Sequence, residues 1–349
     1  MLKVGLIGFG LAGQAFHAPV IRATPGLELA CILERHGSLA REKFQGIRVV
    51  RTLDDLLDDR EIQLCVVATP NTTHFELARR CMEAGRNVVV EKPLAVSSQE
   101  AAELIRVAES TGRVLSVYQN RRWDGDFLTV KRLLASGRLG RIVQYESNWD
   151  RFRPTARVHI WRESGEAGSG VLYDLGSHLI DQAMALFGQP EAITADERIM
   201  RDGARAADAF DVRMHYAGLD VTLRTSLLAC VPRPRFCIFG TQGSFVKLKF
   251  DPQEGRLRRG ESPDQPGWGD EPESEWGTAY FAEGGSVKTE KVKTEKGDYR
   301  EFYGNVRDAV LTDSPLAVTP QDALRTLRAI ELAHASSERR STIEWDAAC

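Results

Sequence analysis

The sequence predicts an α/β protein of two domains, the first built on a doubly wound parallel sheet and the second of the α+β class. The length of 349 residues suffices for two domains, since a domain has about 100–200 residues. Short apolar runs alternate with amphipathic stretches up to about residue 120, and beyond it strand-like runs follow one another directly. We therefore place the domains at residues 1–120 and 121–349.

The first domain is predicted from five apolar runs that have the composition of buried strands. Strands covered on both faces are nearly continuous apolar runs, and parallel strands need helical connections. The candidates are Val4–Ile7, Leu29–Leu33, Leu64–Ala68, Asn87–Val90 and Val114–Val117. Between them apolar residues recur at three- and four-residue steps, which is helical spacing. In such a sheet, ligands bind outside the carboxyl ends of the strands.

The second domain is predicted from one long helix and a series of strands. The helix begins near Leu172 and ends at Gly188, and a final helix covers Asp322–Ser336. Strands without intervening helices favour an antiparallel or mixed sheet, and the candidates are Val212–Tyr216, Val221–Leu228, Phe236–Phe239 and Phe245–Phe250. The segment Asp251–Gly297 is rich in Gly, Pro, Glu and Lys, so we expect a long surface excursion there, either functional or mobile.

Composition argues against several classes of function. With 46 Lys+Arg against 49 Asp+Glu, the chain lacks the basic balance that nucleic-acid binding needs. No run approaches the roughly 18 apolar residues that span a bilayer. The cysteines lie far apart, so we expect small buried hydrophobes in a reducing, cytoplasmic compartment, with no disulfide framework and no metal site. They are Cys31, Cys65, Cys81, Cys230, Cys237 and Cys349.

A glycine-rich turn after the first strand predicts dinucleotide binding. It consists of Gly8, Phe9, Gly10, Leu11, Ala12 and Gly13. Glycines there allow a tight turn, close approach of the backbone to a pyrophosphate and close packing of the next helix. Glu34, 21 positions after Gly13, matches the carboxylate that binds the ribose hydroxyls about 20 residues further on. Glu34 favours NAD, because a carboxylate repels a 2′-phosphate, whereas Arg35 could hold that phosphate and leaves NADP open.

Polar residues follow three further strands at the same predicted edge of the sheet. The cofactor candidates are Thr69, Pro70, Asn71 and His74 after one strand, Glu91 and Lys92 after the next, and Asn120 after the last. Pro93 would end its strand and fix the turn, with a cis bond as one possibility. A solvated β-turn would also explain Glu91-Lys92-Pro93, but its place on the same sheet edge as the glycine turn favours a site.

These motifs resemble the glucose–fructose oxidoreductase / inositol dehydrogenase (Gfo/Idh/MocA) family. The resemblance covers almost the whole chain and rests on GFGLAG, ATPNTTH, EKP and GSGVLYDLGSHLIDQ, while GFGLAGQAFHAPVI and VYQNRRWDGDF are similar to the branch with scyllo-inositol dehydrogenases. It implies a Rossmann domain, a second domain with an open, mainly antiparallel sheet, a homodimer or homotetramer formed through that sheet, and hydride exchange with a secondary alcohol. NADP-using members of that branch often have a small residue and Arg where this chain has Glu34 and Arg35, so the cofactor preference stays open.

The helix that begins near Leu172 carries the candidate acid–base residues. Asp174, His178 and Asp181 share one line at i, i+4 and i+7 between apolar stripes. Buried polar groups must be paired, so a structural Asp–His hydrogen bond is the alternative explanation. Beside a nicotinamide fold, we assign proton transfer to His178, orientation of the imidazole to Asp174, and polarisation of the substrate oxygen to Lys92. A lysine with its usual pKa of about 10.4 is a poor base at neutral pH, although the resemblance implies that in parts of the family the lysine takes the proton.

Substrate contacts are predicted in two places, in addition to Lys92 and His178. Arg121 and Trp123 follow the last strand of the first domain, and Asn148, His159 and Trp161 precede the catalytic helix. They offer donors for hydroxyl groups and a flat surface for a sugar ring, although solvated loop residues and a core tryptophan would explain them equally well. Arg121 and Arg122 could instead indicate an anionic substrate such as a sugar phosphate, and we expect a neutral polyol.

The predicted function is that of an NAD(P)-dependent dehydrogenase acting on a cyclic polyol or sugar. A glucose dehydrogenase and a sugar or anhydro-sugar reductase are the alternatives among enzymes. From another class, a non-catalytic dinucleotide-binding regulator would use the same fold. Such a regulator could lose its lysine and histidine, so the presence of Lys92, Asp174 and His178 together favours the enzyme.

Overall fold

A computed structural model describes residues 1–345 of the chain, and Cys349 lies outside them. The chain packs as two compact units, each assembled from separate segments. The first comprises Met1–Trp123, Pro252–Trp268 and Asp298–Leu324, and the second comprises Asp124–Asp251, Gly269–Gly297 and the chain from Arg325 onwards. The first unit therefore includes two stretches from well beyond residue 120, because the chain returns to it twice.

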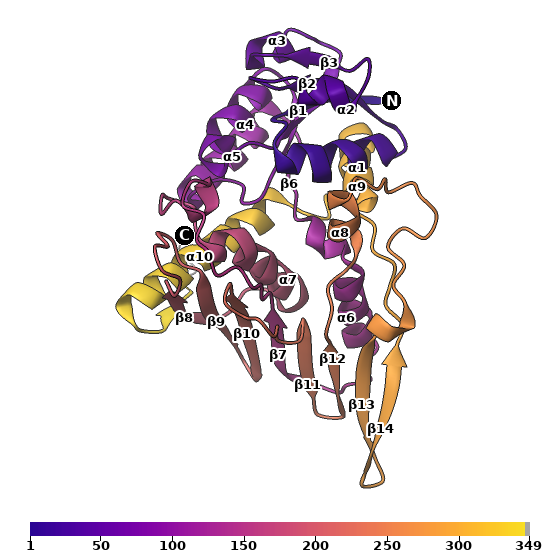
Figure 1. The fold of residues 1–349 in the computed structure, drawn as a ribbon, viewed down its shortest axis with the longest axis vertical. Helices are drawn as coiled ribbons and strands as arrows, with labels where there is room; N and C mark the ends of the chain where they lie inside the picture. The colour runs from indigo at the N-terminus through magenta and orange to yellow at the C-terminus, as the bar shows by residue number, and fades with distance from the viewer. Residues whose placement is uncertain (346–349) are drawn as a thin grey trace. The chain divides into compact units, whose positions relative to one another are not determined.

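The first unit contains a six-stranded parallel sheet in the order β3-β2-β1-β4-β5-β6 (Figure 1). Its strands are β1 (Leu2–Ile7), β2 (Leu27–Leu33), β3 (Arg48–Val50), β4 (Ile62–Val67), β5 (Asn87–Val90) and β6 (Leu115–Val117). The five predicted strands are confirmed, and β3 is an additional short strand at the edge. The strand order reverses between β1 and β4, which is where a doubly wound sheet binds its ligand.

Helices connect these strands. A π-helical turn (Gly13–His17) leads from β1 into α1 (Ala18–Ala23), which packs against α9 (Arg300–Thr312), while α4 (His74–Glu83) packs against α5 (Ser98–Thr111). The Ser97 hydroxyl accepts a hydrogen bond from the Glu100 amide and caps α5, and Gly112 ends this helix in the left-handed conformation. The remaining helices of this unit are α2 (Leu39–Lys43), α3 (Leu53–Leu57) and α8 (Gln253–Arg258).

The second unit is built on a nine-stranded mixed sheet in the order β14-β13-β12-β11-β7-β10-β9-β8-β15. β7 and β10 pair in parallel, and the other neighbours are antiparallel. Its strands are β7 (Ile142–Asn148), β8 (Ala192–Arg198), β9 (Ala209–Tyr216), β10 (Leu219–Ser226), β11 (Phe236–Gly240), β12 (Gly243–Lys247), β13 (Gly277–Glu283), β14 (Ser286–Val292) and β15 (Ile343–Glu344). The predicted open, mainly antiparallel sheet is thus confirmed.

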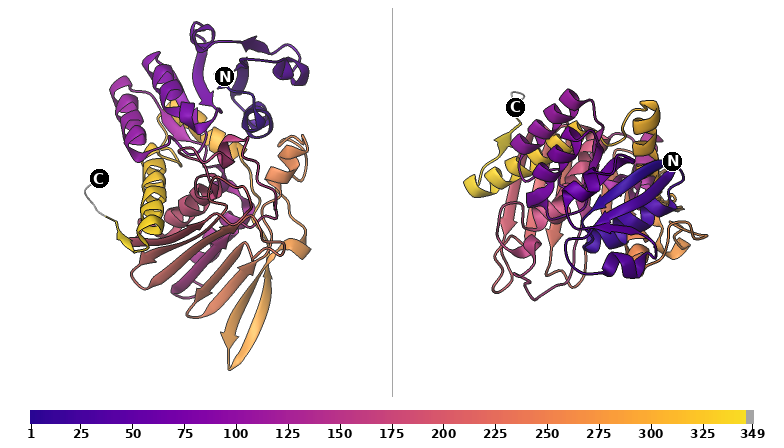
Figure 2. Two further views of the ribbon diagram at one scale, coloured as in Figure 1. Left: turned by 60° about the vertical axis from the view of Figure 1, so that its left-hand side comes forward. Right: turned by 90° about the horizontal axis from the view of Figure 1, so that it is seen from above.

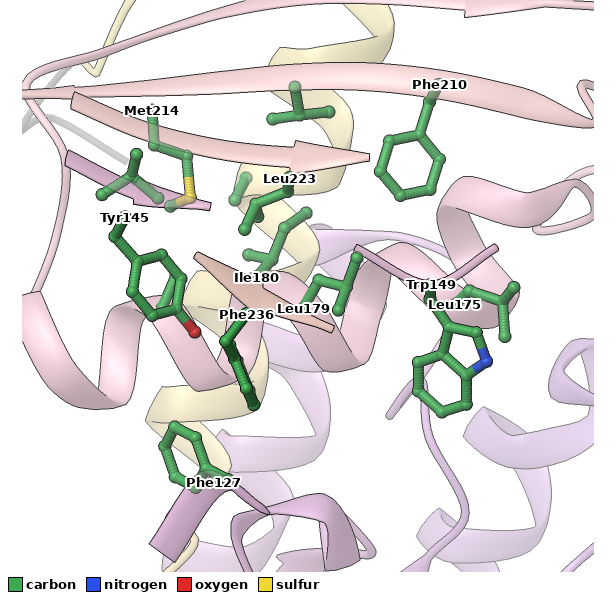
Figure 3. Close-up of a cluster of buried hydrophobic side chains, with 14 of the residues drawn as sticks. Phe127, Tyr145, Trp149, Leu175, Leu179, Ile180, Phe210, Met214, Leu223 and Phe236 are labelled. Carbon is green, nitrogen blue, oxygen red and sulfur yellow. The ribbon is translucent and has the colours of Figure 1, made fainter. Parts of the chain in front are cut away.

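Helices cover one face of this sheet, where the core of the unit lies. They are α6 (Gly125–Ala135), α7 (Ser177–Phe187) and α10 (Pro320–Arg339), the last from Arg325 onwards. Inward-pointing side chains of the strands, such as Phe210, Leu223 and Phe236, meet Leu179 and Ile180 of α7 (Figure 3). Among the described residues, no helix packs on the opposite face (Figure 2).

Two sequence expectations need correction. The segment Asp251–Gly297 is not a long excursion, because it contains α8 and the hairpin of β13 and β14, which extends the sheet, and because Trp268 is buried with its indole N–H donated to Gln253. Its polar composition reflects an edge hairpin with exposed side chains. Cys230 is exposed and Cys237 is half-buried, whereas Cys31, Cys65 and Cys81 are buried as expected; these five cysteines are free of disulfides. No helix within residues 1–345 is long and apolar enough to cross a membrane.

Candidate active site

Backbone hydrogen bonds align the predicted cofactor residues along one edge of the parallel sheet. Gly8 N donates to Leu33 O at the β1–β2 junction, and Ala68 N donates to Ile7 O. On the other side Glu91 N donates to Val67 O, and Tyr118 N donates to Val90 O. Each bond joins the residue that follows one strand to the carboxyl end of its neighbour. The glycine turn, the Thr69 turn and the Glu91–Pro93 turn therefore lie side by side, at the ligand-binding edge of this fold.

The glycine turn has a shape that fits a dinucleotide. Gly8 has φ +98°, and a Cβ there would lie 2.7 Å from the Ala68 carbonyl oxygen. A Cβ on Gly13 would lie 2.4 Å from the Gly8 oxygen, so this glycine permits close packing of the helix on the turn. Gly10 is exposed, and a Cβ on it would have no atom within 4 Å. The three glycines thus provide a tight turn, close helix packing and an open backbone segment that a pyrophosphate can approach.

Glu34 also stabilises the loop in which it lies. It is 7% exposed, and its Oε2 accepts a hydrogen bond of 3.3 Å from the amide of Ala40 at the start of α2. The Arg51 guanidinium donates to the carbonyl oxygens of Glu34 and Gly37, which fixes the shape of the same loop. Arg35 is exposed. The loop thus combines an anchored carboxylate with an exposed cation, and the assignment of Glu34 to the ribose hydroxyls stays a prediction.

His74 joins two of the turns at the sheet edge. Its Nδ1 lies 2.8 Å from the carbonyl oxygen of Pro93, and its Nε2 lies 3.0 Å from that of Thr69. Burial lowers the pKa of His74, although the two carbonyls oppose this shift. The bond between Lys92 and Pro93 is cis. We conclude that His74 holds the Glu91–Pro93 turn against the Thr69 turn, and its contact with a cofactor stays a prediction.

In the second unit, α7 is preceded by a π-helical turn. The helix predicted from Leu172 to Gly188 is present, but residues Leu172–Gly176 form the π turn and α7 begins at Ser177. A Cβ on Gly176 would lie 2.7 Å from Leu172 Cδ1 and 3.2 Å from the ring of Phe210. This glycine therefore lets the turn pack closely on β9. The expected burial of the polar line is confirmed for His178 and Asp181, which are 7% and 1% exposed.

Asp174 and His178 are each held by a neighbouring side chain. The Asp174 carboxylate, with 23% of its side chain exposed, accepts a hydrogen bond of 3.1 Å from Arg162 Nε. The same guanidinium lies over the ring of Trp161, 4.4 Å from its centroid. The His178 ring stacks on Trp149 with centroids 5.6 Å apart. An acid, an imidazole and two indoles are therefore held in place around the start of α7.

The loop that precedes α7 is held by a buried arginine. Arg201 donates to Asp208 at 3.0 Å and to Glu163 at 3.0 Å, and its Nη1 donates to the carbonyl oxygens of Arg153 and Thr155. These bonds order the segment that carries Trp161 and Arg162. His159, in the same segment, is exposed. A guanidinium and an indole are thus held beside Asp174, and the contact of His159 with substrate stays a prediction.

Other predicted substrate residues have structural partners inside their own unit. The buried guanidinium of Arg121 forms an ion pair with Glu254 and donates to the Tyr299 hydroxyl. Trp123 packs edge-on against Phe302 with centroids 5.7 Å apart. Asn148 is 2% exposed and donates to the Pro234 carbonyl oxygen at 2.8 Å. Arg121 and Asn148 are therefore buried and bonded within their units rather than solvated, Trp123 is half-buried, and the contact of all three with substrate stays a prediction. Asn120 is buried at the start of a short 3₁₀ turn after β6.

Comparison with known proteins places this site in a family. Residues 2–119 match the model described as "Oxidoreductase family, NAD-binding Rossmann fold", and residues 131–345 match "Oxidoreductase family, C-terminal alpha/beta domain", the two domains of the Gfo/Idh/MocA proteins. The chain belongs to the Gfo/Idh/MocA oxidoreductase family. The predicted family, fold and nicotinamide dinucleotide cofactor class are therefore confirmed.

Relatives match this family member over nearly its whole length. The uncharacterized oxidoreductase YdgJ of Escherichia coli is 43% identical over 98% of both chains. The scyllo-inositol 2-dehydrogenase (NADP(+)) IolW of Bacillus subtilis is 35% identical over 98% of this chain and 95% of its own. The solved structure of the YPO2259 oxidoreductase from Yersinia pestis superposes with a TM-score of 0.95 at 40% identity, covering 100% of this chain and 98% of that one.

The sequence analysis missed three side chains that support these residues. Trp149 carries the His178 ring, and its signal was an indole directly after Asn148 at the end of a strand. His17 lies beneath the Glu91 turn, and an isolated histidine in the apolar stretch after the glycine turn was its signal. Tyr303 contacts His17 from 286 positions away in the sequence. No local pattern indicates a contact at that separation.

Proposed function

We propose that the protein is an NAD(P)-dependent dehydrogenase that acts on a secondary alcohol of a cyclic polyol or sugar. One observation supports the proposal: the turn that contains Lys92 lies at the same ligand-binding edge of the Rossmann sheet as the glycine turn, with the Thr69 turn between them. The anchored Asp174 and His178 supply the acid–base groups that alcohol oxidation needs. The similarity to IolW, a scyllo-inositol 2-dehydrogenase, supports an inositol-type substrate.

When bound, the nicotinamide accepts or returns a hydride at the alcohol carbon. In the oxidative direction His178 removes the hydroxyl proton, and a positioned general base of this kind contributes about 10²–10⁴-fold to the rate. Asp174 orients the imidazole and stabilises its charged form, while Arg162 holds the Asp174 carboxylate. The Lys92 ammonium binds the alcohol oxygen and stabilises negative charge on it. Trp161 offers a flat surface for the apolar face of a ring.

The cofactor preference is the finer part of the proposal. Glu34 disfavours a 2′-phosphate, whereas the exposed Arg35 can pair with one. Because the Glu34 carboxylate also bonds to the Ala40 amide, its charge is partly engaged within the loop. We propose NAD as the preferred cofactor and NADP as a second one, with the ratio set by Glu34 and Arg35.

The deciding experiment is a substrate panel followed by absorbance of the reduced nicotinamide. Inositols, aldoses, anhydro-sugars and sugar phosphates are each incubated with NAD and with NADP. Reduction of NAD or NADP in the presence of an inositol or a neutral sugar supports the proposal. Exclusive turnover of a sugar phosphate would overturn the assignment to a neutral substrate. Tight cofactor binding with no turnover across the panel would favour a non-catalytic regulator.

We also propose that the protein forms a homodimer or homotetramer through the uncovered face of its mixed sheet. Charged residues of both signs alternate there: Arg224 pairs with Asp211 and Glu146, and Arg198 pairs with Asp211 as well. Such a face can be complementary to itself about a twofold axis. Light scattering after size-exclusion chromatography should give twice or four times the mass of 38.8 kDa. A monomer at micromolar concentration would contradict this proposal.

A further inference from the structure

Three polar side chains from distant segments, two of them buried and the third, Glu91, partly buried, form a continuous chain of hydrogen bonds beneath the Lys92 turn. His17 Nε2 lies 3.0 Å from Glu91 Oε1, and His17 Nδ1 lies 2.5 Å from the Tyr303 hydroxyl. His17 and Tyr303 have no exposed surface. The ring of Tyr118 packs on that of His17 with centroids 4.3 Å apart. The Tyr118 hydroxyl donates a hydrogen bond to the Phe16 carbonyl oxygen.

The direction of each hydrogen bond follows from the chemistry of the two ends. Burial raises the pKa of Glu91, but the hydrogen bond from His17 and the charge of Lys92 outweigh it and lower the pKa overall. Glu91 is therefore a carboxylate that only accepts, so His17 Nε2 carries a proton. Burial raises the pKa of Tyr303 well above its usual value, so its hydroxyl stays protonated and donates to His17 Nδ1. The tautomer of His17 with its proton on Nε2 satisfies both partners.

This chain of hydrogen bonds ends on the backbone of Lys92. While Glu91 Oε1 is bonded to His17, its Oε2 accepts a hydrogen bond of 2.9 Å from the Lys92 amide. One carboxylate thus connects the buried chain to the main-chain atoms from which the Lys92 side chain starts. On the far side of the turn, His74 bonds to the Pro93 carbonyl oxygen. The turn is therefore fixed both before and after Lys92.

We propose that Tyr303, His17 and Glu91 are positioning residues that fix the backbone at Lys92 and thereby set the rate of the chemical step. This inference rests on the proposed role of Lys92 in alcohol oxidation. A carboxylate paired with a histidine away from solvent contributes little net stability to the fold, because desolvation offsets most of the attraction. Such a chain of hydrogen bonds matters more for positioning a reacting group, since a displacement of about 1 Å can reduce the rate about 10²-fold.

The closing experiment combines steady-state kinetics with amide hydrogen exchange measured by NMR on the protein without cofactor. The test variants are Tyr303→Phe, which removes one oxygen, and Glu91→Ala. We expect faster exchange at the Lys92 amide, unchanged exchange at β1 amides, and a kcat about 10–100-fold lower with little change in KM. Glu91→Gln should lose less kcat than Glu91→Ala, because an amide oxygen can still accept from Lys92 N.

Tyr299→Phe is the matched control. Tyr299 is equally buried and lies close to Tyr303 in the sequence, but its hydroxyl contacts Arg121 instead of His17. Its loss should leave both Lys92 exchange and kcat near the wild-type values. The inference is overturned if Tyr303→Phe and Glu91→Ala leave Lys92 exchange unchanged, or if exchange rises while kcat stays constant. A wild-type protein that oxidises no alcohol would defeat the proposed function alone, and the exchange data would then still decide whether the chain fixes Lys92.

Discussion

Two helices of this protein begin in the same unusual way, yet they hold their histidines differently. A five-residue π-helical turn precedes both α1 and α7. His17, at the end of the first turn, has no exposed surface and contacts Tyr303 and Glu91 through its two nitrogens. His178, just after the second turn, stacks on Trp149 and retains 7% exposure. The first arrangement is suited to holding a neighbouring loop, and the second is suited to presenting an imidazole to a ligand.

The local geometry explains why π turns occur at these two places. A π turn contains one more residue than an α turn and is frequent at functional sites. In the first unit it follows the glycine turn and directs His17 toward Glu91. In the second it places Asp174 within reach of Arg162 before the regular helix begins. The same device thus brings a histidine to Glu91 in one unit and an aspartate to Arg162 in the other.

The largest effect should come from removing the second histidine. We expect His178→Ala to reduce kcat about 10²–10⁴-fold, because the general base is lost, while cofactor affinity, measured by fluorescence titration, stays close to that of the wild type. His17→Leu should cause a smaller loss, since Lys92 is displaced but the base is retained. If His17→Leu were the more severe of the two, the contrast between the histidines would be reversed.

A second prediction concerns a buried arginine of the second unit. Arg235 has no exposed surface and bonds to Asp126, Ser147 and Gln182, the last on α7 itself. Arg235→Met leaves the Asp126 carboxylate buried without this partner, which should lower the free energy of unfolding by about 3–5 kcal/mol. The free energy of unfolding is measured by urea denaturation, with tryptophan fluorescence as the signal. The double variant with Asp126→Leu should recover part of the loss, and a loss below about 1 kcal/mol would show that the pair is not structural.

A smaller effect should appear in acid. Burial raises the pKa of Asp150, but the Arg233 guanidinium and the amides of Arg233 and Ser226 outweigh it, so that the pKa lies below its usual value. A lowered pKa in the folded state adds stability above the unfolded pKa of about 3.9, and this stability is lost as the pH falls below that value. Asp150→Asn should therefore be less stable at pH 7 and show a shallower loss between about pH 5 and pH 2. An identical slope in both proteins would exclude Asp150 from the acid transition.

Local sequence patterns predicted the parts of the molecule that local forces determine. Strands buried on both faces, such as β4 and β5, are continuous apolar runs and were found. β7 lies inside the mixed sheet but presents Gln144 and Glu146 on its uncovered face, so its composition hides it. β13 and β14 form an edge hairpin with many exposed polar residues, which resembles a loop in composition.

The candidate site residues were predicted from motifs that each lie at the end of one element, and their roles stay predictions. Gly8–Gly13, Glu91–Pro93 and Asp174–His178 each occupy a short stretch that chemistry restricts to a few residue types. Their supports were not predicted, because Tyr303 reaches His17 only after the chain has returned to the first unit. Arg121 was predicted as a substrate ligand from its position, whereas its partner Glu254 lies 133 positions away. Pairing at such separations depends on the fold and leaves no local pattern.

The most direct test of the account is a double-mutant cycle on kcat with Lys92→Ala and His178→Ala. If the ammonium and the imidazole act on the same hydroxyl group, each single change removes most of the acceleration, and the double variant should be little slower than the slower single one. If the fold-reductions in kcat of the two single variants multiply in the double variant, Lys92 and His178 have independent roles. Near-normal turnover in either single variant would contradict the assignment of that residue.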